Sequence, residues 1–169
     1  MSVIMGSFPN KVFKSEWSFW QIYKYDFVFH AGHEMDIFFD SLDQFVLERG
    51  QVEYYVRSLG PLLGEYINEH FEKVMKVGEP GDFTFASWLD EFYFSDIMED
   101  WGVYCNRGFE IVIFGMGPTA KAAYHRYFDS LSMSGLKYKN VDLAVDAIKP
   151  FLSETEGADF ISQFRKSYS

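Results

Sequence analysis

The chain has 169 residues, a formal net charge of −10 and aromatic side chains at 20 % of its positions. This length suits one hydrophobic core, so we expect residues 1–169 to fold as a single domain. The aromatic content excludes an intrinsically disordered chain. The negative charge argues against binding to nucleic acid or to an anionic membrane, because both require a basic surface. A cationic partner fits this charge better.

The N-terminal part of the chain contains one ambiguous segment. Glycine, proline and asparagine predict an irregular lead-in over residues 1–14. Between Ser15 and His30, six of the seven alternate positions from 17 to 29 are aromatic, which is typical of a strand. The same segment can form a helix capped by Ser15. We favour the helix, because the segments that follow are helical and a lone strand needs a partner.

Helical periodicity is clearer in the next part of the chain. Between Glu34 and Arg49, apolar residues recur every three or four positions with acidic residues between them. This pattern predicts an amphipathic helix that ends near Gly50. We expect a second helix from about Gln51 and a third from about Pro61, because the Gly-Pro pair there marks a joint between helices.

Residues 79–101 form the most acidic stretch of the sequence. They include seven acidic residues, no lysine or arginine, and two of the four tryptophans. A single helix from Thr84 to Trp101 would press the carboxylates of Asp90, Asp96 and Asp100 into an apolar face, which costs several kcal/mol for each unpaired ion. Either Ser95 breaks the helix and resets its phase, or this face presents acids among aromatic rings to a partner.

A glycine-rich turn follows a short apolar segment. Residues 109–114 predict one buried strand, and the pattern from Thr119 to Leu131 predicts a helix. Residues 115–120, with the sequence GMGPTA, match the G-x-G-x-x-G/A pattern and resemble the dinucleotide-binding turn of Rossmann proteins. The resemblance implies phosphate binding by Gly115–Lys121, although the acidic residue expected about 20 positions later is missing. The other interpretation is a plain turn that enters a helix.

Two further helices are expected near the C-terminus. Asn140 can cap a helix that Pro150 ends or kinks, and a short helix is expected from Gly157 to Lys166. Together with the helices above, these predict a mainly α fold, a single-domain bundle of five to seven helices with room for a small β element. The alternative is an α+β fold in which residues 17–29 and 109–114 pair as strands.

Patterns for metal binding and nucleophilic catalysis are weak. His30 and His33 are three residues apart, but the chain has neither an H-E-x-x-H arrangement nor a Glu-x-x-His pair. Cys105 is the single cysteine, which fits a reducing compartment. The first residues lack the pattern of a signal peptide, and no apolar run is long enough to cross a membrane. We therefore expect no metal, no cofactor and a cytoplasmic location.

Charge and aromatic content together favour a binding protein over an enzyme. We predict an inhibitor or immunity protein of bacterial type, which covers the basic active site of a partner such as a nuclease toxin. The residues expected to contact the partner are Asp82, Trp88, Asp90, Glu91, Tyr93, Asp96, Glu99 and Asp100. The alternatives are a nucleotide-binding enzyme that uses Gly115–Lys121 and a structural subunit of a larger assembly. The sequence does not indicate an oligomeric state.

Overall fold

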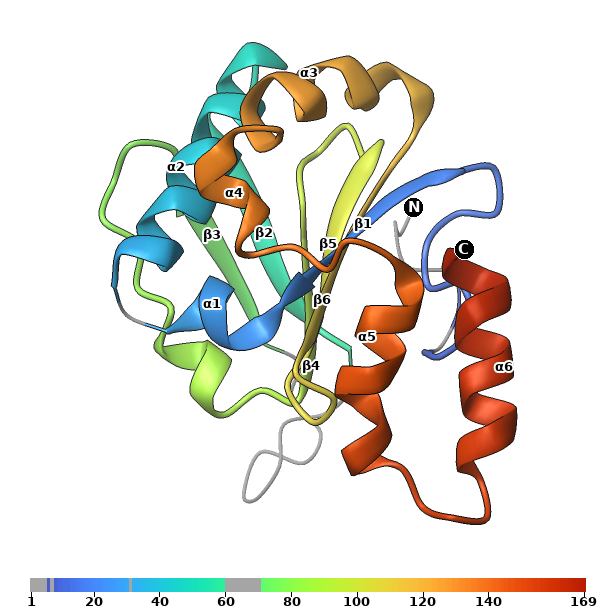
Figure 1. Ribbon diagram of the computed structural model, residues 1–169. Helices are drawn as coiled ribbons and strands as arrows, with labels where there is room; N and C mark the ends of the chain where they lie inside the picture. The colour runs from blue at the N-terminus through green and yellow to red at the C-terminus, as the bar shows by residue number, and fades with distance from the viewer. Residues whose placement is uncertain (1–5, 7, 31, 60–70) are drawn as a thin grey trace.

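The computed structural model describes residue 6 and residues 8–30, 32–59 and 71–169. At the centre of this described part is an antiparallel sheet of six strands in the order β1-β6-β5-β4-β2-β3 (Figure 1). The strands are β1 (Phe19–Lys24), β2 (Glu53–Ser58), β3 (Glu72–Lys76), β4 (Glu91–Ser95), β5 (Trp101–Asn106) and β6 (Ile111–Met116). The fold is therefore α+β, and the prediction of a mainly α, all-α bundle is wrong.

Helices and short helical turns surround this sheet (Figure 1). The α-helices are α1 (Tyr25–Phe29), α2 (His33–Glu48), α3 (Pro118–Phe128), α4 (Leu131–Ser134), α5 (Val141–Ile148) and α6 (Gly157–Tyr168). Among the described residues, the 3-10 turns are η2 (Thr84–Ser87) and η3 (Lys149–Phe151). Strands β1 and β6 pair in register from Phe19 opposite Met116 to Lys24 opposite Ile111. The alternative expectation, an α+β fold in which these two segments pair, is confirmed.

The larger core lies between one face of the sheet and α1 to α4. Alternate residues of each strand point to this face, and Phe94 and Phe114 are fully buried there. From α2, the side chains of Phe38, Leu42 and Phe45 pack against them and are also fully buried. Each such side chain contributes about 1.5–3 kcal/mol by leaving water. The acidic residues of α2 lie outside this core, on the rest of the helix surface.

The smaller core lies on the other face of the sheet, beneath α5, α6 and the N-terminal segment. Tyr104 and Ile113 from the sheet meet Val145 and Phe164 from the two helices. The hydroxyl of Tyr168 accepts the Val12 main-chain N–H at 3.1 Å and so ties the two ends of the chain together. Within the described residues, β2 and β3 contribute no buried side chain to this second core.

Several predicted elements are confirmed. The helix expected from Glu34 is α2, the helix expected from Thr119 is α3, and the strand expected near residue 109 is β6. The side chain of Asn140 caps α5, because its Oδ1 accepts the N–H of Leu143 at 3.0 Å. These segments have one apolar face each or a short apolar run, so local periodicity is enough to identify them.

Three helices predicted in the first half of the chain contain strands instead. Residues 19–24 form strand β1 instead of a helix, because their partner β6 is distant in the sequence. The helix expected from Gln51 is strand β2. The helix expected from Pro61 begins outside the described residues, and its expected C-terminal part is strand β3. When a strand pairs with a segment far away in the sequence, its own residues do not indicate which segment that is.

The acidic stretch is neither one helix nor two. It forms η2, then β4, a tight turn and β5, so the helical interpretation of residues 84–101 is wrong. A secondary-structure element does end at Ser95, as expected, because β4 ends there. The break separates two strands, however, and not two helices. Phe94 faces the larger core and Tyr93 the smaller core. Because both faces of β4 are buried, its apolar residues show no clear period of two.

Candidate functional site

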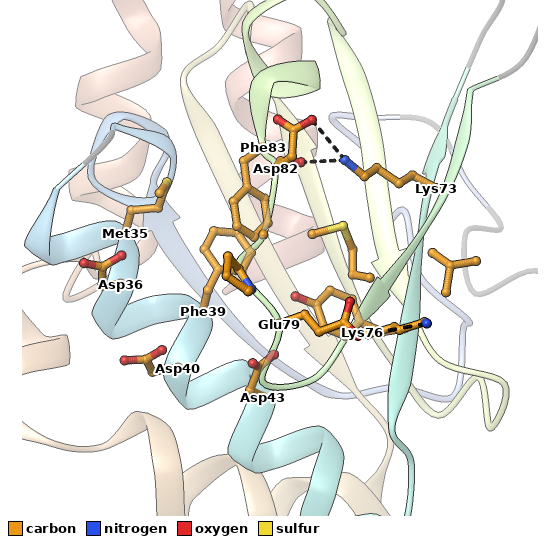
Figure 2. A pocket seen from close by; sticks show the side chains of 15 residues that line it. Met35, Asp36, Phe39, Asp40, Asp43, Lys73, Lys76, Glu79, Asp82 and Phe83 are labelled. Carbon is orange, nitrogen blue, oxygen red and sulfur yellow. Dashed lines mark hydrogen bonds and ion pairs between the residues drawn. The ribbon is translucent and has the colours of Figure 1, made fainter.

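A hollow with a volume of about 380 Å³ lies between α2, β3 and residues 79–83 (Figure 2). We call it the acidic groove, because five carboxylates line it: Asp36, Asp40, Asp43, Glu79 and Asp82. Lys73 and Lys76 of β3 also line it, so the carboxylates outnumber the ammonium groups by three. A concave surface with this excess of negative charge favours a cationic ligand.

Three of the carboxylates come from successive turns of α2. Asp36, Asp40 and Asp43 are four and three residues apart, so they share one side of the helix (Figure 2). Within the described residues, the carboxylates of Asp36 and Asp40 have no ion pair and no hydrogen bond. The carboxylate of Asp43 accepts the main-chain N–H of Gly78 at 2.9 Å. This side of the groove therefore carries negative charge without a counter-charge.

The environment of Asp43 resists ionisation. Burial raises the pKa of the Asp43 carboxyl above its usual range, and the nearby Asp40 carboxylate raises it further. The hydrogen bond from Gly78 acts in the opposite direction. A cation beside Asp43 would favour the ionised form of its carboxyl group, because an opposite charge stabilises the carboxylate.

The lysines on the opposite side of the groove already have anionic partners. The ammonium group of Lys73 lies 3.3 Å from the Asp82 carboxylate and donates a hydrogen bond to the Asp82 carbonyl at 3.0 Å. The ammonium group of Lys76 lies 4.0 Å from the Glu79 carboxylate. Figure 2 shows these two contacts on the side away from α2. The unbalanced charge of the groove is therefore that of the α2 aspartates.

Aromatic side chains form the inner surface of the groove. The rings of Phe39 and Phe83 stack with centroids 3.9 Å apart, between α2 and the loop (Figure 2). Tyr54 of β2 also lines the groove and is only 2 % exposed. Its hydroxyl has no hydrogen-bond partner in the described part of the chain. Burial and the charge of Asp43 raise the pKa of Tyr54, so this hydroxyl stays protonated and can donate.

A second hollow, of about 620 Å³, continues from the acidic groove past Met35 and residues 81–83. Two of its polar side chains have partners within the protein. The hydroxyl of Tyr25 donates to the carbonyl of Ala86 at 2.6 Å, and Arg107 pairs with Asp90 at 2.8 Å. Three acidic residues and one arginine line this second hollow, so its excess of negative charge is smaller than that of the acidic groove.

One of the eight residues expected to contact a partner, Asp82, lines the acidic groove. Asp90 lies outside it and forms its ion pair with Arg107. Glu91 accepts hydrogen bonds from two side chains of β5, at 2.8 and 3.1 Å. Trp88 is 47 % exposed and packs edge-on against a neighbouring phenylalanine. The structure therefore separates these residues instead of gathering them on one surface.

The other expected contact residues lie in or beside the β4–β5 turn. Asp96 is 1 % exposed and Tyr93 is 7 % exposed, so their side chains belong to the interior. Asp100 forms an ion pair with Arg49. Glu99 adopts a positive φ of 50° in the turn, and its carbonyl accepts a hydrogen bond from a lysine at 2.8 Å. The turn uses most of these acids for internal contacts.

The GMGPTA turn joins β6 to α3 and is packed against the protein itself. A Cβ atom on Gly115 would lie 2.4 Å from the ring of Phe13, so the interior requires glycine there. The N–H of Gly117 donates to the carbonyl of Asp100 at 2.8 Å, and the hydroxyl of Thr119 donates to the Asp100 carboxylate at 2.8 Å. Asp100 thus occupies the start of α3, where a phosphate would bind.

The described residues contain no group of three or more His, Cys, Asp or Glu side chains placed to hold a metal ion. Cys105 is fully buried in β5, and burial raises the pKa of its thiol. No helix in the described ranges has the length and apolar character needed to span a lipid bilayer. The acidic groove is therefore the strongest candidate site in this part of the chain.

Comparison with protein-family models, with curated proteins and with solved structures finds no match for this chain.

The α2 aspartates are the site residues that sequence reasoning missed. Their spacing is visible as the polar side of the predicted helix. The opposite wall of the groove is not visible, because residues 72–76 are predicted as helix and fold as strand β3.

Proposed function

We propose that this protein is an inhibitor or immunity-type binding protein, whose acidic groove takes a basic surface of another protein. The observation that carries the proposal is the pair of unpartnered carboxylates of Asp36 and Asp40 in a hollow whose two lysines already have anionic partners. A cationic group that enters the groove can form ion pairs with these two carboxylates, and no ion pair within the protein has to break.

The net charge of the protein supports the same partner class. A net charge of −10 speeds the approach of a basic protein and repels acidic ones. A nuclease toxin is the partner with the best match, because a nuclease binds phosphate groups through lysine and arginine. An inhibitor with carboxylates on its surface imitates those phosphates and blocks the active site.

The proposed contact set differs in part from the set expected from the sequence. Asp82 stays in it at the rim of the groove, and the α2 aspartates and Glu79 join it. Phe39 and Phe83 supply aromatic surface beside these charges. Aromatic side chains next to carboxylates suit arginine in particular, because a guanidinium group can stack on a ring while it binds an anion.

The proposal is tested by cross-linking the protein in a lysate of the cells that express it and identifying the partner by mass spectrometry. We expect a basic protein, cross-linked through residues of α2 or β3. The triple variant Asp36→Asn, Asp40→Asn and Asp43→Asn should weaken binding of the purified partner about 100-fold and reduce its salt dependence.

A matched control changes the net charge equally at a distant surface. Glu154→Gln, Glu156→Gln and Asp159→Asn remove three exposed charges in and before α6, and should change the affinity less than about threefold. Equal losses in both triple variants would show that only overall charge matters. An acidic or neutral partner would also contradict the proposal.

A further inference from the structure

The acidic groove reaches the outer edge of the sheet. Four consecutive residues of β3, Lys73 to Lys76, line it. Neighbouring side chains of a strand point to opposite faces, so a hollow on one face touches only alternate residues. A hollow that touches four in a row also contacts the main chain of the strand. The groove therefore borders the polar main-chain groups of β3.

The hydrogen-bond pattern of the hairpin identifies which of these groups are open. Val77 donates its N–H to the carbonyl of Val52, and Ser58 donates to the carbonyl of Phe71, so these two pairs are of the hydrogen-bonded kind. Such pairs alternate along an antiparallel ladder. Val74 falls in the other kind of pair, so its N–H and C=O point away from β2.

Val74 has open main-chain groups at the centre of this edge. Its side chain is 45 % exposed, and no main-chain hydrogen bond to its N–H or C=O from outside the hairpin is present within the described residues. The opposite edge of the sheet is different. There, Lys24 donates to the carbonyl of Leu136 and Tyr138 donates to that of Ile22, both at 2.9 Å, so another segment covers β1.

The groove also contains an open polar side chain deep inside it. The hydroxyl of Tyr54 has no hydrogen-bond partner in the described part of the chain, although the residue is only 2 % exposed and lines the groove. The oxygen of this hydroxyl is accessible from the groove, so it can donate a hydrogen bond to an acceptor of a ligand there. The groove thus offers main-chain, hydroxyl and carboxylate groups together.

We propose that the occupant of the groove is an extended basic segment of the partner protein, which adds to the edge of β3 as a further strand. This inference rests on the proposed function and specifies how the partner binds. The main chain of the segment pairs with the N–H and C=O of Val74. Its basic side chains on one face reach the α2 aspartates, which stand opposite β3 across the groove (Figure 2).

The probe for this mode is a fluorescent peptide with the sequence acetyl-(Arg-Thr)₄-amide, whose arginines share one face when it is extended. Two N-methylated forms carry the methyl groups either on every arginine amide or on every threonine amide. The two forms have the same charge and composition. A strand that pairs along one edge uses only alternate amides. We therefore expect one form to bind about tenfold or more weakly and the other to bind within about threefold of the parent peptide.

The matching change in the protein is Val74→Pro, which removes the outward N–H while leaving the bonds to β2 in place. Val74→Thr is its control, because threonine keeps the N–H and the β-branched shape. We expect Val74→Pro to weaken the parent peptide about tenfold and Val74→Thr to have little effect. Thermal melting of both variants checks that they fold.

The outcomes separate this inference from the proposed function. Binding that is lost in the triple α2 variant but unaffected by Val74→Pro and by either methylation would overturn strand addition and leave the acidic groove intact. A wild-type dimer that Val74→Pro converts to a monomer, with no peptide bound, would show that a second copy pairs with β3 and would overturn the inference. Peptide binding that the triple α2 variant does not weaken would contradict the proposed function as well.

Discussion

Arg49, the residue after α2, forms an ion pair with Asp100, the residue before β5. Their side chains are 11 % and 23 % exposed, so water screens the pair only in part. The same carboxylate accepts the hydroxyl of Thr119 at 2.8 Å. One acidic residue therefore connects the end of α2, the β4–β5 turn and the start of α3.

Removing the arginine should destabilise the fold. Arg49→Met leaves the Asp100 carboxylate beside the buried Asp96 without its counter-charge, so we expect the free energy of unfolding to fall by about 2–4 kcal/mol. Urea unfolding measures this change. Lys149→Met is the control, because it breaks an exposed pair with Asp146 and should leave stability nearly unchanged. Equal effects of the two variants would contradict the structural role of the Arg49 pair.

The carboxyl group of Asp96 should destabilise the protein at neutral pH. Burial raises its pKa, and Asp100 adds to the rise, while the hydrogen bond from the N–H of Met98 and the charge of Arg49 oppose it. A raised pKa in the folded state means that the folded protein binds this proton more readily than the unfolded chain. Stability is therefore gained as the pH falls through the folded-state pKa towards 3.8, and lost as the pH rises.

Asp96→Asn tests this sign. Asparagine keeps the Oδ1 atom that accepts the Met98 N–H at 2.9 Å and removes the buried charge. We expect a higher melting temperature than the wild type at pH 7, and a difference that shrinks as the pH approaches 4. Asp159→Asn on the exposed side of α6 changes the net charge equally and should show no such trend. A variant less stable than the wild type at pH 7 would refute the prediction.

The sequence identifies a helix or strand when its packing partners are close in the sequence, or when its apolar residues form one face. Residues 34–49 alternate apolar and acidic residues at helical spacing, and α2 is found there. Residues 19–24 show an alternating pattern, but their helical alternative cannot be rejected without knowing that β6 pairs with them. The fold class therefore depends on long-range pairing, which local periodicity does not contain.

The sequence predicts only part of the candidate site, because one wall of the groove also depends on long-range pairing. The aspartates of α2 follow from the polar side of a predicted helix, whereas the edge of β3 becomes available only when the sheet forms. In the acidic stretch, clustering in the sequence suggested one surface. A strand pair instead sends Phe94 and Tyr93 to opposite cores and turns Asp96 inward. Clustered charge in the sequence therefore did not identify clustered charge in space.

The glycine at position 115 should be required by packing, independently of any nucleotide. Gly115→Ala forces a methyl group into the ring of Phe13, so we expect a loss of about 1–3 kcal/mol in the free energy of unfolding. Gly135→Ala, which adds a methyl group to open space, should be nearly neutral. Combining Gly115→Ala with Phe13→Ala should cost less than the sum of the single changes. A strictly additive double variant would contradict the contact.

The hydroxyl groups of Tyr23 and Tyr124 lie 2.7 Å apart and satisfy each other inside the larger core. Both residues are buried, at 0 % and 1 % exposure, so water does not replace a lost partner. Tyr23→Phe and Tyr124→Phe should each lower the free energy of unfolding by about 1–2 kcal/mol, because each leaves one buried hydroxyl unpaired. The double variant removes both hydroxyls and should cost about as much as either single change, which a double-mutant cycle in urea measures. If the two costs simply add, the hydroxyls do not depend on each other, and the polar contact between β1 and α3 contributes no coupling.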